Sequence, residues 1–159
     1  MAEPIREQFL DRMVTVVSMA LATGYTWGTF PPTTVWRSYQ PLVNLGDRLR
    51  VFVLDGDFSF SPRPDQHDGA FDDRFSIDIL IQVAGDSETP ASRWGNRALD
   101  AIKRAIADGT QAHGLLYPLT KLRVQFEDEG AVHQVGDRAE FILPCTALLP
   151  ENLGPFQED

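Results

Sequence analysis

The sequence predicts an α+β fold: a two-layer domain in which two amphipathic helices pack on a mainly antiparallel, or mixed, β-sheet. Two long segments carry apolar residues at helical spacing, and several shorter ones alternate apolar and polar residues. The predicted element order is α-β-β-β-α-β-β, in which strands and helices do not alternate regularly. Helices grouped beside strands in this way favour a sheet covered on one face over a doubly wound parallel fold.

Two helices are predicted. The first covers residues 4–23, because Pro4 suits a first helical turn, Gly24 suits the position after the last turn, and apolar residues recur between them at helical spacing. The second covers residues 90–107 and ends at Asp108-Gly109. Its apolar stripe is Trp94, Ala98, Ala101, Ile102, Ala105 and Ile106. Its polar face is Arg93, Asn96, Arg97, Asp100, Lys103 and Arg104, which we interpret as a solvated helix surface.

Five strands are predicted from the alternating segments. They cover residues 33–39, 48–54, 75–83, 121–127 and 138–149. The third is the clearest, with Phe75, Ile77, Ile79, Ile81 and Val83 on one side and Ser76, Asp78 and Gln82 on the other. Pro144 lies inside the last predicted strand and indicates a sheet edge or a bulge.

One domain is expected from a chain of 159 residues with 43% apolar and 23% charged residues. The predicted domain covers residues 1–149, carries a long loop at residues 55–73, and is followed by a tail at residues 150–159. The formal net charge of −9 repels phosphate backbones, so ordinary nucleic-acid binding is disfavoured. The first residues mix both signs of charge before any apolar run, unlike a signal peptide, and we expect a soluble protein with no membrane partner.

The predicted loop reads DGDFSFSPRPDQHDGAFDD and holds six aspartates, one histidine and three phenylalanines. Its spacing does not match a calcium loop, and adjacent His67 and Asp68 do not complete a zinc site. The chain also contains no GxSxG elbow and no GxxxxGK[ST] phosphate loop. We therefore expect no catalytic residue, metal or cofactor. The alternative in the enzyme class is a metal-dependent hydrolase that uses Asp55, Asp57, His67 and Asp68.

Large apolar rings on a long polar loop are typical of a protein–protein contact. We predict that the loop orders against another subunit, that its aspartates keep it soluble beforehand, and that Arg63 forms an ion pair across the contact. The C-terminal tail either lies on a neighbouring subunit in the same way or is a disordered end. The predicted interface residues are Asp55, Asp57, Phe58, Phe60, Arg63, His67, Asp68, Phe71, Leu153 and Phe156.

Two short phrases and the order of elements carry a resemblance to a known family. The phrases are Val35-Trp36-Arg37 in the first predicted strand and Asp55-Gly56-Asp57 at the end of the second. A long loop, a strongly alternating strand, a second helix and a closing β-pair follow. This layout, over about residues 4–149, resembles the tail terminator, or tail completion, proteins of long-tailed bacteriophages.

The resemblance implies a structural virion protein and not an enzyme. Members of that family form a hexameric ring that caps the tail tube, stops its polymerisation and offers a surface for joining the head. The implied partners are further copies of the chain, the tail tube protein and a head connector or completion protein, while DNA passes through without specific binding. The implied location is the head-proximal end of the virion tail, and the host cytoplasm during assembly.

Two further readings stay open. Another head–tail connector or neck protein would share the helix-plus-sheet layout. An acidic module that imitates nucleic acid or captures a basic partner would concentrate its carboxylates on one face, whereas this sequence distributes them over the predicted loop, the turns and the tail.

Overall fold

The computed structural model describes residues 4–23, 35–37, 49–62, 70–85, 90–109, 125–126, 131–135 and 138–152. Within these residues the elements are α1 (Ile5–Thr23), β1 (Val35–Trp36), β2 (Leu49–Pro62), β3 (Ala70–Ala84), α2 (Ala91–Gly109), β4 (Gln125–Phe126), β5 (Ala131–Val135) and β6 (Arg138–Asn152). The strands form one sheet in the order β1-β2-β3-β6-β4, and β5 also pairs with β6. The pair β1–β2 is parallel and the other pairs are antiparallel, so the sheet is mixed and the predicted α+β class is confirmed.

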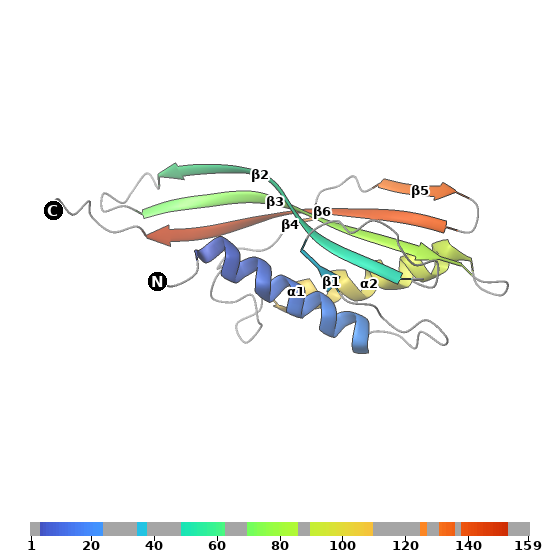
Figure 1. Cartoon of the computed structure of the whole chain (residues 1–159). Coiled ribbons are helices and arrows are strands. Elements are labelled where there is room, and N and C mark those ends of the chain that lie inside the picture. Colours follow the sequence, from blue (N-terminus) through green and yellow to red (C-terminus); the bar gives the residue numbers. More distant parts are fainter. Residues whose placement is uncertain are drawn as a thin grey trace.

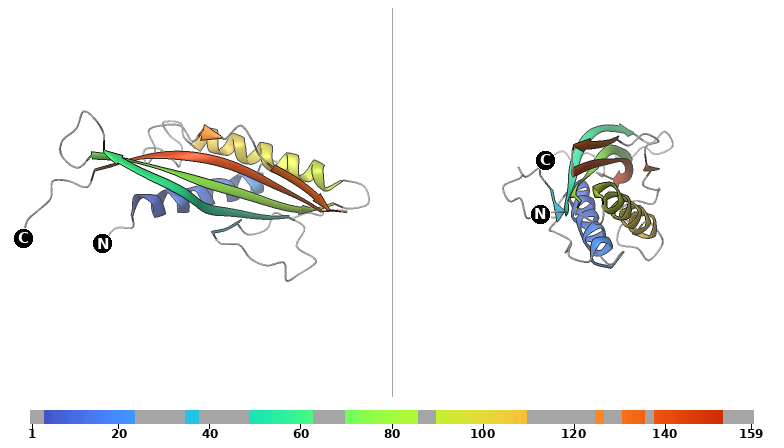
Figure 2. Two further views of the ribbon diagram at one scale, coloured as in Figure 1. Left: turned by 90° about the horizontal axis from the view of Figure 1, so that it is seen from above. Right: turned by 90° about the vertical axis from the view of Figure 1, so that its right-hand side faces the viewer.

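Both helices lie on the same face of the sheet and form the second layer (Figure 1). They pack side by side, with α1 toward β1 and β2 and with α2 on β3 and β6 (Figure 2). In the part of the chain that the structure describes, no helix combines the length and the apolar character needed to cross a membrane.

The hydrophobic core lies between the helices and the sheet. Along β3, Ile77, Ile79 and Ile81 are fully buried, as the alternation predicted. The helices contribute Phe9, Leu10, Met13, Val17 and Leu21 from α1 and Trp94, Ala98, Ile102 and Ile106 from α2. Each large apolar side chain buried in this way stabilises the fold by about 1.5–3 kcal/mol.

The face of the sheet that points away from the helices is also buried at its β1 end. Arg50 and Phe52 point away from the helices but are only 3% and 0% exposed. The ring of Trp36 stacks on that of Phe52 with centroids 5.5 Å apart, and the Arg50 guanidinium lies 5.4 Å and 5.1 Å from the two centroids. Cation–π attraction therefore helps to accommodate a buried charge beside β1.

The segment after α2 contains one strand more than predicted. β5 lies between the last two predicted strands, residues 121–127 and 138–149, and it pairs with β6 from Val135 opposite Arg138. Pro144 does not interrupt β6: it lies opposite Asp78 of β3. Pro144 falls between the part of β6 that pairs with β5 and the part that pairs with β4, so no described strand pairs with it on that side. The missing N–H of proline is tolerated at such a position.

The prediction of a loop over residues 55–73 is wrong for most of that segment. β2 continues through Pro62, β3 begins at Ala70, and Pro62 lies opposite Phe71. The predicted tail is also partly strand, because β6 continues to Asn152. The physical reason is an alternation of large apolar and small polar residues after Asp57, a strand pattern that prevails here over the high content of turn-forming residues.

Candidate assembly interface

A β-bulge interrupts β2 at Asp55-Gly56-Asp57, the acidic motif on which the resemblance partly rests. Pairing with β3 runs to Asp55 and resumes at Phe58, so Gly56 and Asp57 together lie opposite Ser76. An ideal Cβ at Gly56 would lie 2.9 Å from the Cβ and 3.0 Å from the carbonyl oxygen of Ser76. The close approach therefore requires glycine, and the bulge bends the strand and increases its twist.

Beyond the bulge the sheet continues as three strands, which we call the arm. The arm consists of Phe58–Pro62 of β2, Ala70–Phe75 of β3 and Ala147–Asn152 of β6. The β2 and β6 segments each pair antiparallel with the β3 segment between them. The strand ends of the arm run past the N-terminal turn of α1 in two perpendicular views (Figures 1 and 2). The arm therefore reaches beyond the helical layer that covers the rest of the sheet.

The arm has an edge without a strand partner on each side, as far as the described residues extend. β1 pairs with β2 only at Val51 and Phe52, so the edge of β2 from Val53 onward has no further partner. On the other side, β5 and β4 pair with β6 only as far as Thr146. Backbone N–H and C=O groups along such edges are a template for adding a strand of another chain.

The bulge also decides which side of the sheet the phenylalanine positions share. Phe58 lies opposite Phe75, and Phe60 lies opposite Asp73. Positions 73 and 75 are four and two residues before Ile77, so they lie on the same side of β3 as Ile77, which is fully buried beneath the helices. Strand alternation therefore places positions 58 and 60 in the rows that continue the helix-facing side of the sheet.

One ion pair fastens α1 to the arm. The Arg6 guanidinium donates hydrogen bonds from Nη2 to both carboxylate oxygens of Asp73, at 2.7 Å and 2.8 Å, and from Nε to Oδ2 at 3.1 Å. The Asp73 side chain is 6% exposed and that of Arg6 is 29% exposed. A buried carboxylate is tolerated only with a well-aligned partner, so this contact holds the first turn of α1 against β3.

A second cluster of charges surrounds Arg37. Its guanidinium lies 3.0 Å from Glu7, 3.3 Å from Asp55 and 3.5 Å from Asp11, measured to the nearest carboxylate oxygens. The structure thus brings together Arg37 and Asp55, one residue from each phrase that carries the resemblance. We call Glu7, Asp11 and Asp55 the acidic cluster; their side chains are 42%, 68% and 51% exposed.

The hydrogen bond from Arg37 lowers the pKa of Glu7 below its ordinary value of 4.5, and Glu7 in turn raises the pKa of Arg37. Because the folded-state pKa of Glu7 lies below that of the unfolded chain, the stabilisation is complete above 4.5 and is lost as the pH falls through the folded-state value.

Glu7→Gln is therefore expected to lower the free energy of unfolding at neutral pH by less than about 1 kcal/mol, since both side chains of the pair are partly exposed. The difference from the wild type should shrink at about pH 3, as measured by urea denaturation at the two pH values. Asp108→Asn, at an exposed position of α2, is the control and should show little effect at either pH. A Glu7→Gln difference that does not change with pH would contradict the assigned ion pair.

The predicted interface residues fall into three groups. Asp55 belongs to the acidic cluster. Asp57, Phe58, Phe60 and Phe71 lie in strands of which the structure describes the backbone at these positions. Arg63, His67, Asp68, Leu153 and Phe156 lie outside the described residues. Their roles at an interface stay predictions.

Arg6, Asp73 and Glu7 were not predicted from the sequence as members of charge clusters. The available signal was at Asp73, which precedes Phe75 and Ile77 by even steps and so continues the apolar row of β3. A carboxylate in such a row indicates a buried charge that needs a cation, although the pattern does not show which cation.

Within the described residues, His, Cys, Asp and Glu side chains form no group of three or more that could hold a metal ion. The hydrolase alternative also needs Asp57, His67 and Asp68, whose side chains lie outside the described part of the chain, and it stays a prediction. Cys145 is buried on the inward side of β6, and its Sγ lies 3.3 Å from the carbonyl oxygen of Ile77. A buried thiol of this kind is ordinary packing.

Comparisons with known proteins show a shared fold. No protein-family model matches the chain, and no curated protein matches it in sequence. Among solved structures, the chain is similar to one chain of the structure described as "Virion of native gene transfer agent (GTA) particle". The TM-score is 0.52, the sequence identity is 13%, and the similarity covers 92% of both chains. At this level of identity the likeness establishes the fold.

Proposed function

We propose that the chain is a structural protein of a phage-like virion and acts as a tail terminator. Copies of it form a ring, with six members in the family that the sequence resembles, which caps the tail tube and ends its polymerisation. The observation that carries the proposal is the fold shared over 92% of both chains with a protein of a gene transfer agent virion. The resemblance read from the sequence points to the same class of protein.

The arm supports a ring. A closed ring of identical subunits requires heterologous contacts, in which two different surfaces of each copy meet. The arm offers such a pair: the edge of β2 beyond Val53 on one side and the edge of β6 beyond Thr146 on the other. Because its strand ends pass the first turn of α1, a neighbouring copy can reach them without displacing a helix (Figure 1).

The net charge of −9 agrees with passage of DNA through such a ring. An acidic surface repels phosphate groups, so a genome can move past it without being held. The partners in this proposal are further copies of the chain, the tail tube protein and a head connector protein. The site of action is the head-proximal end of the tail.

The proposal is tested by mass and by imaging. Light scattering is expected to show a discrete species of about six times the 17.8 kDa monomer, alone or after addition of tail tubes. Electron microscopy should then show a ring at one end of tubes of uniform length. A wild-type protein that neither associates nor binds tube ends would overturn the proposal. A ring that binds heads but leaves tube length unregulated would indicate a neck protein instead.

A variant of the arm supplies the matched test. Ser59→Lys with Ser61→Lys places charges along the outer strand of the arm, and lysines on an edge strand oppose strand addition. We expect a folded monomer that does not cap tubes. Ser18→Lys with Ala22→Lys, on the exposed side of α1, adds the same charge elsewhere and should assemble like the wild type.

A further inference from the structure

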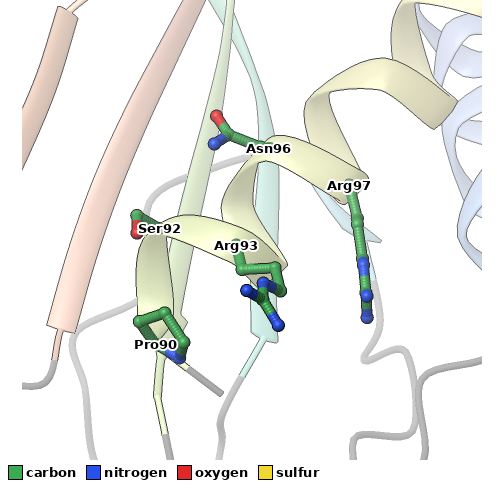
Figure 3. A pocket seen from close by; sticks show the side chains of 5 residues that line it. All are labelled: Pro90, Ser92, Arg93, Asn96 and Arg97. Atoms are coloured by element: carbon green, nitrogen blue, oxygen red, sulfur yellow. The ribbon is translucent and has the colours of Figure 1, made fainter.

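The exposed face of α2 is cationic in a protein that is otherwise acidic. A shallow hollow of about 430 Å³ lies beside the first turns of the helix and is lined by Pro90, Ser92, Arg93, Asn96 and Arg97. Arg93 and Arg97 extend from the same side of α2 (Figure 3). The sequence alone suggested an ordinary solvated helix surface, but the two guanidinium groups gather beside one hollow.

The hollow favours an anionic partner. α2 has no acidic residue in its first turn, and the N-terminus of a helix is its positive end, so the arginines add to a charge of the same sign. Arg97 is held in place by Trp94, with its guanidinium carbon 5.0 Å from the ring centroid. Among the residues the structure describes, Arg93 and Arg97 form no ion pair, whereas Arg104 pairs with Asp100 at 2.9 Å.

The acidic cluster is the complementary surface. Three carboxylates surround the single guanidinium of Arg37, so the cluster keeps an excess of negative charge. Asp11 and Asp55 are the more exposed of the three, and their contacts with Arg37 are the longer ones, at 3.5 Å and 3.3 Å. Both carboxylates can therefore accept further hydrogen bonds from a cation outside the molecule.

The two surfaces lie on different helices and toward opposite ends of the helical layer. The acidic cluster includes Glu7 and Asp11 near the start of α1, and the hollow lies beside the first turns of α2, which begins near the other end of the sheet (Figure 1). One copy therefore presents a negative surface toward one end and a positive surface toward the other. Two such surfaces on one subunit suit the heterologous contact that a ring requires.

We infer that the hollow of α2 in one copy receives the acidic cluster of the next copy. Arg93 and Arg97 of one subunit pair with Asp11 and Asp55 of its neighbour by charge-assisted hydrogen bonds. The contact sets the orientation of each subunit relative to its neighbour, and the attraction between the opposite charges speeds their association. This inference rests on the proposed ring and names a second contact within it, separate from the arm.

The test reverses each surface and then mixes the variants. Arg93→Asp with Arg97→Asp makes both surfaces of a copy acidic, and Asp11→Lys with Asp55→Lys makes both cationic. Each variant alone repels its own copies. An equimolar mixture restores opposite charges at every contact, in a ring with alternating members. Lys103→Asp with Arg104→Asp changes the charge of the same helix by the same amount, farther from the hollow, and is the control.

Association is measured by sedimentation velocity at about 50 mM salt, where exposed charges are weakly screened. Each reversed variant is expected to associate at least about tenfold more weakly than the wild type, and the mixture is expected to recover most of that loss. The control should stay close to the wild type, and wild-type association should weaken at about 500 mM salt. Circular dichroism checks folding; if a reversed variant does not fold, Arg93→Gln and Asp11→Asn replace it.

Two results would overturn the inference: a mixture that associates no better than either variant alone, or a control as damaged as the variant at Arg93 and Arg97. If these occur while the wild type still forms rings or caps tubes, the proposed function stands and the contact is assigned wrongly. If the wild type shows neither behaviour, both proposals fail.

Discussion

Gly95→Ala is expected to lower the free energy of unfolding by about 2 kcal/mol. An ideal Cβ at Gly95 would lie 1.9 Å, 2.4 Å and 2.6 Å from Cε2, Cζ and Cδ2 of Phe141. The Phe141 ring is 3% exposed, so it has little room to turn away, and α2 must shift from β6 instead. Alanine gains up to about 1 kcal/mol over glycine in helix propensity, which offsets only part of this loss.

Urea denaturation followed by circular dichroism measures the effect, with Asn96→Ala as the control. Asn96 is the next residue of the same helix and is exposed, so its replacement by alanine should leave stability equal or slightly higher. Gly95→Ala combined with Phe141→Leu should be less destabilised than the sum of the single variants, because a smaller side chain removes the steric conflict. Equal stability of Gly95→Ala and the wild type would show that α2 does not approach β6 this closely.

The parts of the fold that were predicted correctly are those with one strong period in the sequence. α1, α2 and the central part of β3 each repeat apolar residues without a break, so pattern alone places them. β5 was missed because its sequence, AVHQV, is short and alternates weakly. The better signal was Gly136-Asp137, a pair of turn residues of the kind that joins two strands of a hairpin.

The arm was missed because the bulge shifts the phase of the alternation. Before it, the helix-facing positions of β2 are Leu49, Val51 and Val53; after it, they continue at Phe58 and Phe60. A pattern with a fixed period of two residues therefore fails at Gly56, where the helix-facing positions change from odd to even residue numbers. The aspartates, glycines and prolines of the same segment then favoured a loop, although strand pairing continues to Pro62.

The charge clusters could not be predicted from the sequence alone. Arg6 and Asp73 are 67 residues apart, and Arg37 and Glu7 are 30 apart, so their pairing depends on how the helix and the strands pack. The sequence indicated a polar face on α2, but only the folded helix shows that Arg93 and Arg97 share a hollow. The predicted contacts with neighbouring subunits involve surfaces of other chains, which a single sequence does not position.

Removal of the Arg6 guanidinium is expected to have the largest effect. Arg6→Ala should lower the free energy of unfolding by about 3 kcal/mol or more, because it leaves the buried Asp73 carboxylate without the group that donates three hydrogen bonds to it. Arg104→Ala is the matched control. Its bond to Asp100 is of similar length, 2.9 Å, but joins side chains that are 78% and 41% exposed, so a loss below about 0.5 kcal/mol is expected.

The double variant Arg6→Ala with Asp73→Ala separates the two terms in this effect. If an unpaired buried carboxylate causes most of the loss, removal of the carboxylate as well should recover part of the stability, and the double variant should be more stable than Arg6→Ala alone. If the attraction itself is the main term, the double variant should be no more stable than the single one. A loss for Arg6→Ala as small as that for Arg104→Ala would instead mean that water reaches Asp73, and that α1 does not hold the base of the arm.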